Sequence, residues 1–267
     1  MKFQVAHDAR PQVNLLLTAV AISLVLWFIP FAGWLVYPFQ LFVTFIHEGS
    51  HVIAALLTGE AVHSLSVAPD TSGMVMSSST GTVSQMIISS AGYVGAVGFG
   101  ALLLYLIRLG VRPNIVLFFC SILVGILTVV FGFLAPALNI FSGTTGILSI
   151  GFTVLAGAFL TATLFLAASF LKGWWANFIL SFLAVQCLLN AFFNIRDLFL
   201  ISSMTPYAHS DAVNMAQATG LPAILWVLIW LGISVLITTL ALRVYSYSRQ
   251  APVSAGAGEP MFDASNI

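Results

Sequence analysis

The sequence predicts an all-α polytopic membrane protein with about six or seven transmembrane helices and one small β-hairpin. Apolar residues make up 60% of the 267 residues and only 6% are charged, whereas an average soluble domain is about 25% charged. The apolar residues also gather into runs of about 20, the length that a helix needs to cross the hydrocarbon core of a bilayer. We therefore expect a multi-pass integral membrane protein that is in contact with lipid.

Seven runs meet this length criterion, each bounded by polar residues or by Pro and Gly. We expect the first to be a retained span, because it is too long for a signal peptide and lacks a clear cleavage site. We expect residues 1–246 to form a single transmembrane domain and the Ser-, Ala-, Gly- and Pro-rich residues 247–267 to form a disordered tail. The seven runs cover residues 14–36, 39–58, 84–107, 114–135, 144–171, 174–200 and 221–245.

Two connections between these runs carry local structure. In residues 61–82, Leu65 and Val67 alternate with serines, and a turn sequence, PDTSG, follows. This pattern predicts a β-hairpin directly after the second span. Residues 201–220 are polar, and either Ser210 or Asp211 suits the N-cap of a short helix that ends near Gly220.

The second span carries a metal-binding motif, H-E-G-S-H, at residues 47–51. Positions i and i+4 share one face of a helix, so His47 and His51 can present their imidazoles to one cation, with Glu48 beside them. This is the H-E-x-x-H pattern of zinc enzymes. Ionisable groups at membrane depth cost about 2.5–3.5 kcal/mol each, and a divalent metal offsets that cost. The alternatives are polar contacts between helices and a proton relay.

A tetrahedral catalytic zinc needs a third protein ligand, which is often a carboxylate. In the sixth span, Gln186, Asn190, Asn194 and Asp197 follow one another at helical spacing, which places a polar stripe on an apolar helix. We therefore prefer Asp197 as the third ligand, with Asn190 and Asn194 as hydrogen-bond donors to the ligands or to a substrate backbone. Asp211 is the second choice, and it is equally well explained as a helix N-cap.

Two further observations limit the possible partners and packing. The formal net charge is zero, which gives no electrostatic field for nucleic acid, so we expect no nucleic-acid partner. In the third span, Gly92, Ala96 and Gly100 follow a small-xxx-small spacing that lets helices approach closely, and we expect that span to pack against the helix with the histidines.

The sequence does not indicate an oligomeric state.

Together these features resemble the site-2 protease family of intramembrane zinc metalloproteases. The shared features are the H-E-x-x-H helix, the hairpin after it, the Gly-rich next span, and a later span with Asn residues ahead of an Asp. The Asp197-Leu198 step, Ser210-Asp211-Ala212 and residues 219–222 (TGLP) more narrowly resemble its peptidase-family B-like branch. The family's L-D-G tripeptide is absent, because no Gly follows Asp197, and this leaves the choice between Asp197 and Asp211 open.

The resemblance implies that residues 1–246 are a metallopeptidase-like domain that binds Zn through His47, His51 and an Asp. Glu48 is then the catalytic base, and the reaction is hydrolysis of a peptide bond in or near a transmembrane segment of a substrate protein. A substrate helix must unwind before attack, and the free edge of the hairpin is suited to hold the unwound segment as an added strand. The alternatives are a non-catalytic relative that binds membrane proteins and an ion or proton transporter.

Overall fold

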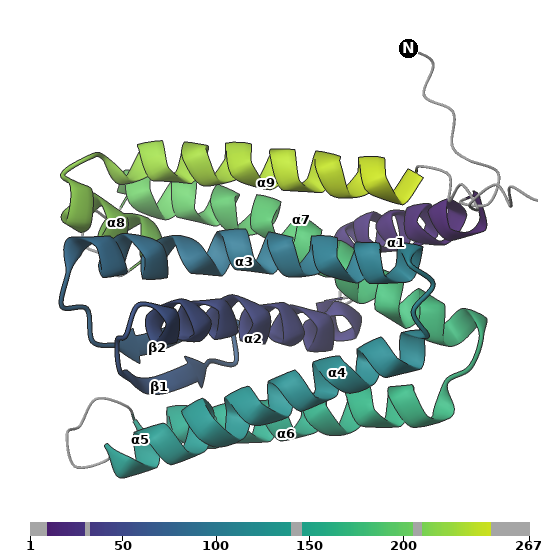
Figure 1. Ribbon diagram of the computed structural model, residues 1–267, viewed down its shortest axis with the longest axis horizontal. Helices are drawn as coiled ribbons and strands as arrows, with labels where there is room; N and C mark the ends of the chain where they lie inside the picture. The colour runs from purple at the N-terminus through teal and green to yellow at the C-terminus, as the bar shows by residue number, and fades with distance from the viewer. Residues whose placement is uncertain (1–9, 30–32, 140–145, 205–209, 247–267) are drawn as a thin grey trace, which may run out of the picture.

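The protein is a bundle of long helices with one hairpin, and the computed structural model describes residues 10–29, 33–139, 146–204 and 210–246 (Figure 1). Side chains are described in these ranges except at 10–12, 27–28, 190–204 and 246. The predicted tail, 247–267, lies outside the described residues. The helices are α1 (Arg10–Phe28), α2 (Gly33–Leu57), α3 (Thr82–Arg108), α4 (Pro113–Ile126), α5 (Ala135–Leu138), α6 (Ile147–Phe170), α7 (Trp174–Met204), α8 (Asp211–Thr219) and α9 (Ala223–Ser246).

The length and composition of these helices confirm the prediction of a multi-pass membrane protein. Five helical stretches in the described residues are long and apolar enough to cross a bilayer: Gly33–Leu57, Thr82–Arg108, Pro113–Leu138, Ile147–Phe170 and Ala223–Tyr245. Two shorter apolar helical stretches, Val13–Leu26 and Trp174–Leu189, lie in α1 and α7. A bilayer accommodates such differences in length through tilt and local thinning.

The first, second and fourth predicted spans differ from the observed helices in their limits. The expected first span, 14–36, is too long at its C-terminal end, because α1 ends at Phe28 and α2 already begins at Gly33. Pro38 therefore lies inside α2 rather than before it. Proline has no backbone N–H and cannot donate the hydrogen bond of a helix interior. For that reason Pro38 separates the first two predicted spans. In the fourth span, the helix continues from α4 through a π-helical segment, η2 (Leu127–Leu134), into α5.

The predicted hairpin is present and lies along α2. Strand β1 (Val62–Val67) pairs antiparallel with β2 (Gly73–Ser77), with Leu65 opposite Val75. The four residues from Ser64 to Val67 are buried, and the backbone N–H of Val67 donates to Thr153 Oγ1 of α6 (2.9 Å). One edge of the hairpin is thus fixed to the helical bundle, and β2 forms the other edge.

The site is built on α2 and the elements around it. Helix α3 packs against α2, α7, α8 and α9, while α4 and α6 pack against each other. Figure 1 shows α2 and its hairpin between α3 and the pair formed by α4 and α6, with α8 at the end of the bundle where the hairpin and the start of α3 also lie. Elements far apart in the sequence therefore meet near the C-terminal half of α2.

Candidate metal centre

Helix α2 places both motif histidines on the face that is turned toward α3. Their ring centroids are 4.9 Å apart, as expected for positions i and i+4. Only 12% of the His47 side chain and 6% of the His51 side chain are exposed. Imidazoles this far from solvent need polar or charged partners.

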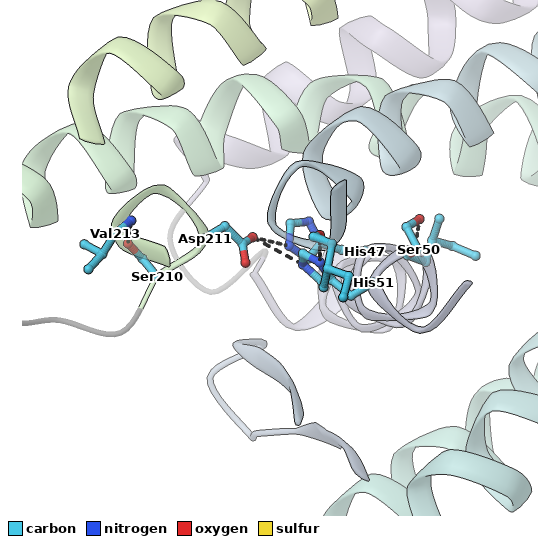
Figure 2. A network of polar contacts seen from close by, with 8 residues as sticks. His47, Ser50, His51, Ser210, Asp211 and Val213 are labelled. Carbon is cyan, nitrogen blue, oxygen red and sulfur yellow. Dashed lines mark hydrogen bonds and ion pairs between the residues drawn. The ribbon is translucent and has the colours of Figure 1, made fainter. Parts of the chain in front are cut away.

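The partner is Asp211, which the first turn of α8 directs at the two histidines. Asp211 Oδ2 lies 3.2 Å from His47 Nε2 and 3.2 Å from His51 Nε2 (Figure 2). The N-cap of α8 is Ser210, whose Oγ accepts a hydrogen bond from the backbone N–H of Val213 (3.3 Å). Because Ser210 caps the helix, the Asp211 carboxylate does not serve as the cap and is available to the histidines.

The donor set of these three side chains fits a zinc ion. Their ligand atoms all lie within 4.8 Å of one another. Two ligand atoms about 2.0–2.1 Å from a tetrahedral zinc lie roughly 3.3–3.4 Å apart, close to the observed separations between nitrogen and oxygen. His51 Nδ1 donates to the backbone carbonyl of Ile88 (2.7 Å). This bond leaves the lone pair of a neutral imidazole on Nε2, the atom that faces Asp211, so a cation or a proton must stand between the two acceptors.

Space for the two imidazoles exists because α3 has no side chain at Gly92. A Cβ atom at this position would overlap Nε2 of both His47 and His51, and one at Gly95 would overlap the Ser50 hydroxyl. The expected close packing of α3 on the histidine helix is thus confirmed for Gly92. Gly100 instead faces α7, where an added Cβ would lie 3.0 Å from the carbonyl oxygen of Ala184 and 3.0 Å from Cys187 Cβ.

Glu48 lies beside the histidines and against the hairpin. Its side chain is buried, with 4% exposed. Gly73, the first residue of β2, stands so close that an added Cβ would overlap the Glu48 carboxylate. The Glu48 carboxylate therefore lies against β2, the strand whose outer edge pairs with no other described strand.

Hydrogen bonds hold the hairpin in this position at both ends. At the turn, Thr44 Oγ1 donates to the carbonyl of Thr71 (2.6 Å) and the Tyr37 hydroxyl donates to the carbonyl of Pro69 (2.8 Å). At the open end, Glu60 Oε1 accepts from Thr80 N (2.9 Å), Thr80 Oγ1 (2.9 Å) and Ser84 Oγ (2.7 Å). These bonds, that of the Thr80 N–H above all, lower the pKa of Glu60 from 4.5 to about 2.

The structure brings together part of the predicted site. His47, Glu48, His51 and Asp211 converge, whereas the side chains of Asn190, Asn194 and Asp197 lie outside the described residues. Asp197 is the third ligand that the sequence favours, but the acid that the described structure places at the histidines is Asp211. From the predicted polar stripe, Gln186 is described, and its Nε2 donates to Ser23 Oγ of α1 (3.0 Å).

Sequence reasoning missed three parts of this site. The Ile88 carbonyl that orients His51 is a backbone group, which no sequence pattern marks. Gly73 was interpreted as a turn residue, although its second role is to make room for Glu48. The third part is Tyr93, whose ring packs on His47 with centroids 4.8 Å apart. Its position directly after Gly92 was the one feature of the sequence that could have placed it near the histidines.

Comparison with known proteins gives one match. A family model described as Peptidase M50B-like matches residues 16–241, which include α2, the hairpin and α8. No curated protein and no solved structure matches the chain.

Proposed function

This chain belongs to the Peptidase M50B-like family, and from that premise we propose that it is a zinc-dependent intramembrane endopeptidase. The match confirms the resemblance to the site-2 protease family that the sequence motifs indicated. The proposed reaction is hydrolysis of a peptide bond in or near a transmembrane segment of a substrate protein. The proposed partners are that substrate and membrane lipid.

The observation that carries the proposal is the convergence of His47, His51 and Asp211 beside the buried Glu48. The three ligand groups come from two elements that are distant in the sequence, and their atoms lie at separations that suit one zinc ion. We assign His47, His51 and Asp211 as the zinc ligands, in place of the Asp197 that the sequence favoured.

When bound, zinc would polarise the scissile carbonyl and make a water molecule acidic enough to lose a proton near neutral pH. Glu48 is placed to take that proton, because it follows His47 on the same helix and is shielded from bulk solvent. The same carboxyl group can then deliver the proton to the leaving amine. The Ile88 carbonyl keeps the ring of His51 in the tautomer that offers Nε2 to the site.

The free edge of β2 gives the substrate a place beside this machinery. A helix in lipid has all of its backbone groups internally paired, so a segment must unwind before a peptide bond can be attacked. An unwound segment added to β2 would pair with the strand backbone and would lie next to Glu48, because Gly73 of β2 is in contact range of that carboxylate. The edge of β2 that no described strand pairs with and the proposed catalytic base are thus neighbours.

The test compares the wild-type chain with Glu48→Gln and His47→Ala, purified in detergent for zinc analysis and expressed in cells for mass spectrometry of new protein N-termini. We expect zinc in the wild type and in Glu48→Gln but little in His47→Ala, and new N-termini within transmembrane segments only with the wild type. Gln has the size of Glu but cannot accept the proton, so this variant separates binding from catalysis.

Other outcomes would favour the rival functions. Equal zinc in the wild type and Glu48→Gln without any difference in N-termini would indicate a relative that binds membrane proteins and does not cleave them. Absence of zinc from all three chains would remove the site assignment and would leave an ion or proton path through His47 and Glu48 as the better explanation.

A further inference from the structure

A pair of stacked aromatic rings links the histidines to α8 and α9. The edge of the Tyr93 ring meets the ring of His47 with centroids 4.8 Å apart and an interplanar angle of 88°. On its other side, Tyr93 stacks on Trp230 of α9, with centroids 5.2 Å apart and an angle of 16°. Only 7% of Tyr93 and 1% of Trp230 are exposed. Both rings are therefore fixed inside the protein.

The two histidines are oriented in different ways. A histidine that ligates a metal ordinarily donates its second ring N–H to an acceptor, which fixes the plane of the ring. His51 follows this rule through Ile88. For His47, the polar and ring contacts within the described residues are those with Asp211, the ring of His51 and the ring of Tyr93, and α3 also lies against it at Gly92. Among the described residues, the ring of His47 is thus held by ring contact with Tyr93, without a hydrogen bond of the kind that His51 makes to Ile88.

The same aromatic pair also forms part of the surface on which α8 packs. Tyr93 and Trp230 belong to a small buried cluster, separate from the main core, that includes Ala212 and Met215 of α8 and Val227 of α9. Ala212 directly follows Asp211, and it is completely buried. The depth at which α8 packs on this cluster therefore sets how far the Asp211 carboxylate reaches toward the histidines.

We propose that Tyr93, supported by Trp230, is a positioning residue for the metal centre. Its ring contacts His47, and it also belongs to the cluster on which α8, the helix that carries Asp211, packs. This role rests on the proposed function, since it requires His47 and Asp211 to be ligands. Aromatic pairs of this geometry contribute through ring contact beyond simple burial, so the ring is the part that matters.

The test uses Tyr93→Leu, which removes the ring, and Tyr93→Phe, which keeps it. The matched control is Phe99→Leu, which removes a partly buried ring from the same helix that contacts Phe42 and not the histidines. Three quantities are measured on the purified full chain: zinc affinity by competition with a chelator, the visible absorption spectrum with Co²⁺ in place of zinc, and the melting temperature of the metal-free protein. The Co²⁺ spectrum reports coordination geometry, which a packing change elsewhere does not alter.

We expect Tyr93→Leu to weaken zinc binding by about 10–100-fold, the usual effect of losing a group that orients a ligand, and to change the Co²⁺ spectrum. Tyr93→Phe should restore both, and Phe99→Leu should lower the melting temperature without changing either. If Tyr93→Leu fails to fold, Trp230→Leu serves in its place, because it removes the support of Tyr93 and leaves the ring on His47. A smaller loss of affinity in the same direction is then expected.

Two results would overturn the proposal while the proposed function stands. One is a Tyr93→Leu chain that melts at a lower temperature but binds zinc with wild-type affinity and shows the wild-type Co²⁺ spectrum. The other is a Tyr93→Phe chain that is as defective as Tyr93→Leu, which would assign the effect to the hydroxyl group. If the wild-type chain itself binds no metal, the proposed function and this role of Tyr93 both fall.

Discussion

The carboxylate of Asp211 lies 3.2 Å from Nε2 of His47, although 164 residues separate the two in the sequence. Two features of α8 produce this contact: Ser210 caps the helix, and Ala212 and Met215 anchor it in the cluster around Tyr93. The side chain amide of Gln85 on α3 adds a hydrogen bond to the carbonyl of Asn214 (3.2 Å). Asp211 is therefore held at the histidines by a helix that is capped at its own N-terminus and that packs against α3 and α9.

The first prediction concerns the third ligand. Asp211→Asn should reduce zinc affinity by more than the roughly 10–100-fold typical of a group outside the ligand set, because a neutral amide is a poor substitute for a carboxylate ligand. Asp197→Asn should bind zinc as the wild type does. Elemental analysis and chelator competition on both variants give the answer. Zinc lost from Asp197→Asn and retained in Asp211→Asn would restore the assignment made from the sequence.

From the sequence, His47 and His51 could be identified as a pair that shares one helix face, whereas Asp211 was only the second choice for the third ligand, after Asp197, and the reason is physical. An i, i+4 pair is fixed by the geometry of one helix, so its members are neighbours wherever the helix lies. The position of Asp211 depends on how a short polar segment packs against α3 and α9. Water can solvate a carboxylate in a polar connection at little cost, whereas a carboxylate at membrane depth needs a partner, and this difference favours Asp197 when only the sequence is known.

For the helices and the hairpin too, the sequence predicted the local structure but not the contacts between distant segments. Hydropathy and turn composition located the spans and the hairpin at 61–82, since both depend on short stretches of sequence. Neither indicates that β1 would fold back along α2 and bond to Thr153 of α6, which lies 86 residues further on. The predicted boundary between the first two spans was wrong because the sequence does not distinguish a proline inside a helix, such as Pro38, from a proline that precedes one.

The second prediction concerns Gly92. Gly92→Ala should abolish zinc binding and cleavage, because the added methyl group overlaps both imidazoles and neither ring can move away without losing Asp211 or Ile88. The matched control is Gly98→Ala on the same helix, where an added Cβ has no neighbour within 4 Å. That change should be neutral or stabilising by up to about 1 kcal/mol, since alanine is the better helix former. Normal zinc content in Gly92→Ala would contradict the close approach of α3 to α2.

The third prediction separates the hairpin from the metal centre. Thr44→Val removes the hydroxyl that binds the Thr71 carbonyl, and a lost hydrogen bond of this kind costs about 0.5–1.5 kcal/mol. If the hairpin turn must be held for substrate to bind, cleavage should slow by about 2- to 13-fold while zinc affinity stays the same. Thr163→Val, which removes only the bonds to the carbonyls of Phe159 and Leu160 within α6, is the control. An unchanged cleavage rate in Thr44→Val would show that this tether is not used.

The fourth prediction concerns acid stability. The pKa of Glu60 is lowered to about 2 from its ordinary 4.5, so its ionised form stabilises the folded protein at every pH above about 4.5. This contribution is lost progressively as the pH falls from about 4.5 to about 2, because the unfolded chain takes up the proton first. Glu60→Gln should therefore have a lower melting temperature than the wild type near neutral pH, with the difference shrinking across this range. A difference that does not depend on pH would contradict the role of the charge.

The separation of the ligands along the chain also has a consequence during synthesis. Both histidines and Glu48 emerge from the ribosome early, but Asp211 follows 164 residues after His47. At about 5–20 residues per second this delay lasts roughly 8–33 s. Throughout that interval the nascent chain holds only two of the three proposed ligands, which is too few for a closed tetrahedral site. The protease that we propose would therefore stay inactive until its last third is inserted, and an incomplete chain released early would not cut its neighbours in the membrane.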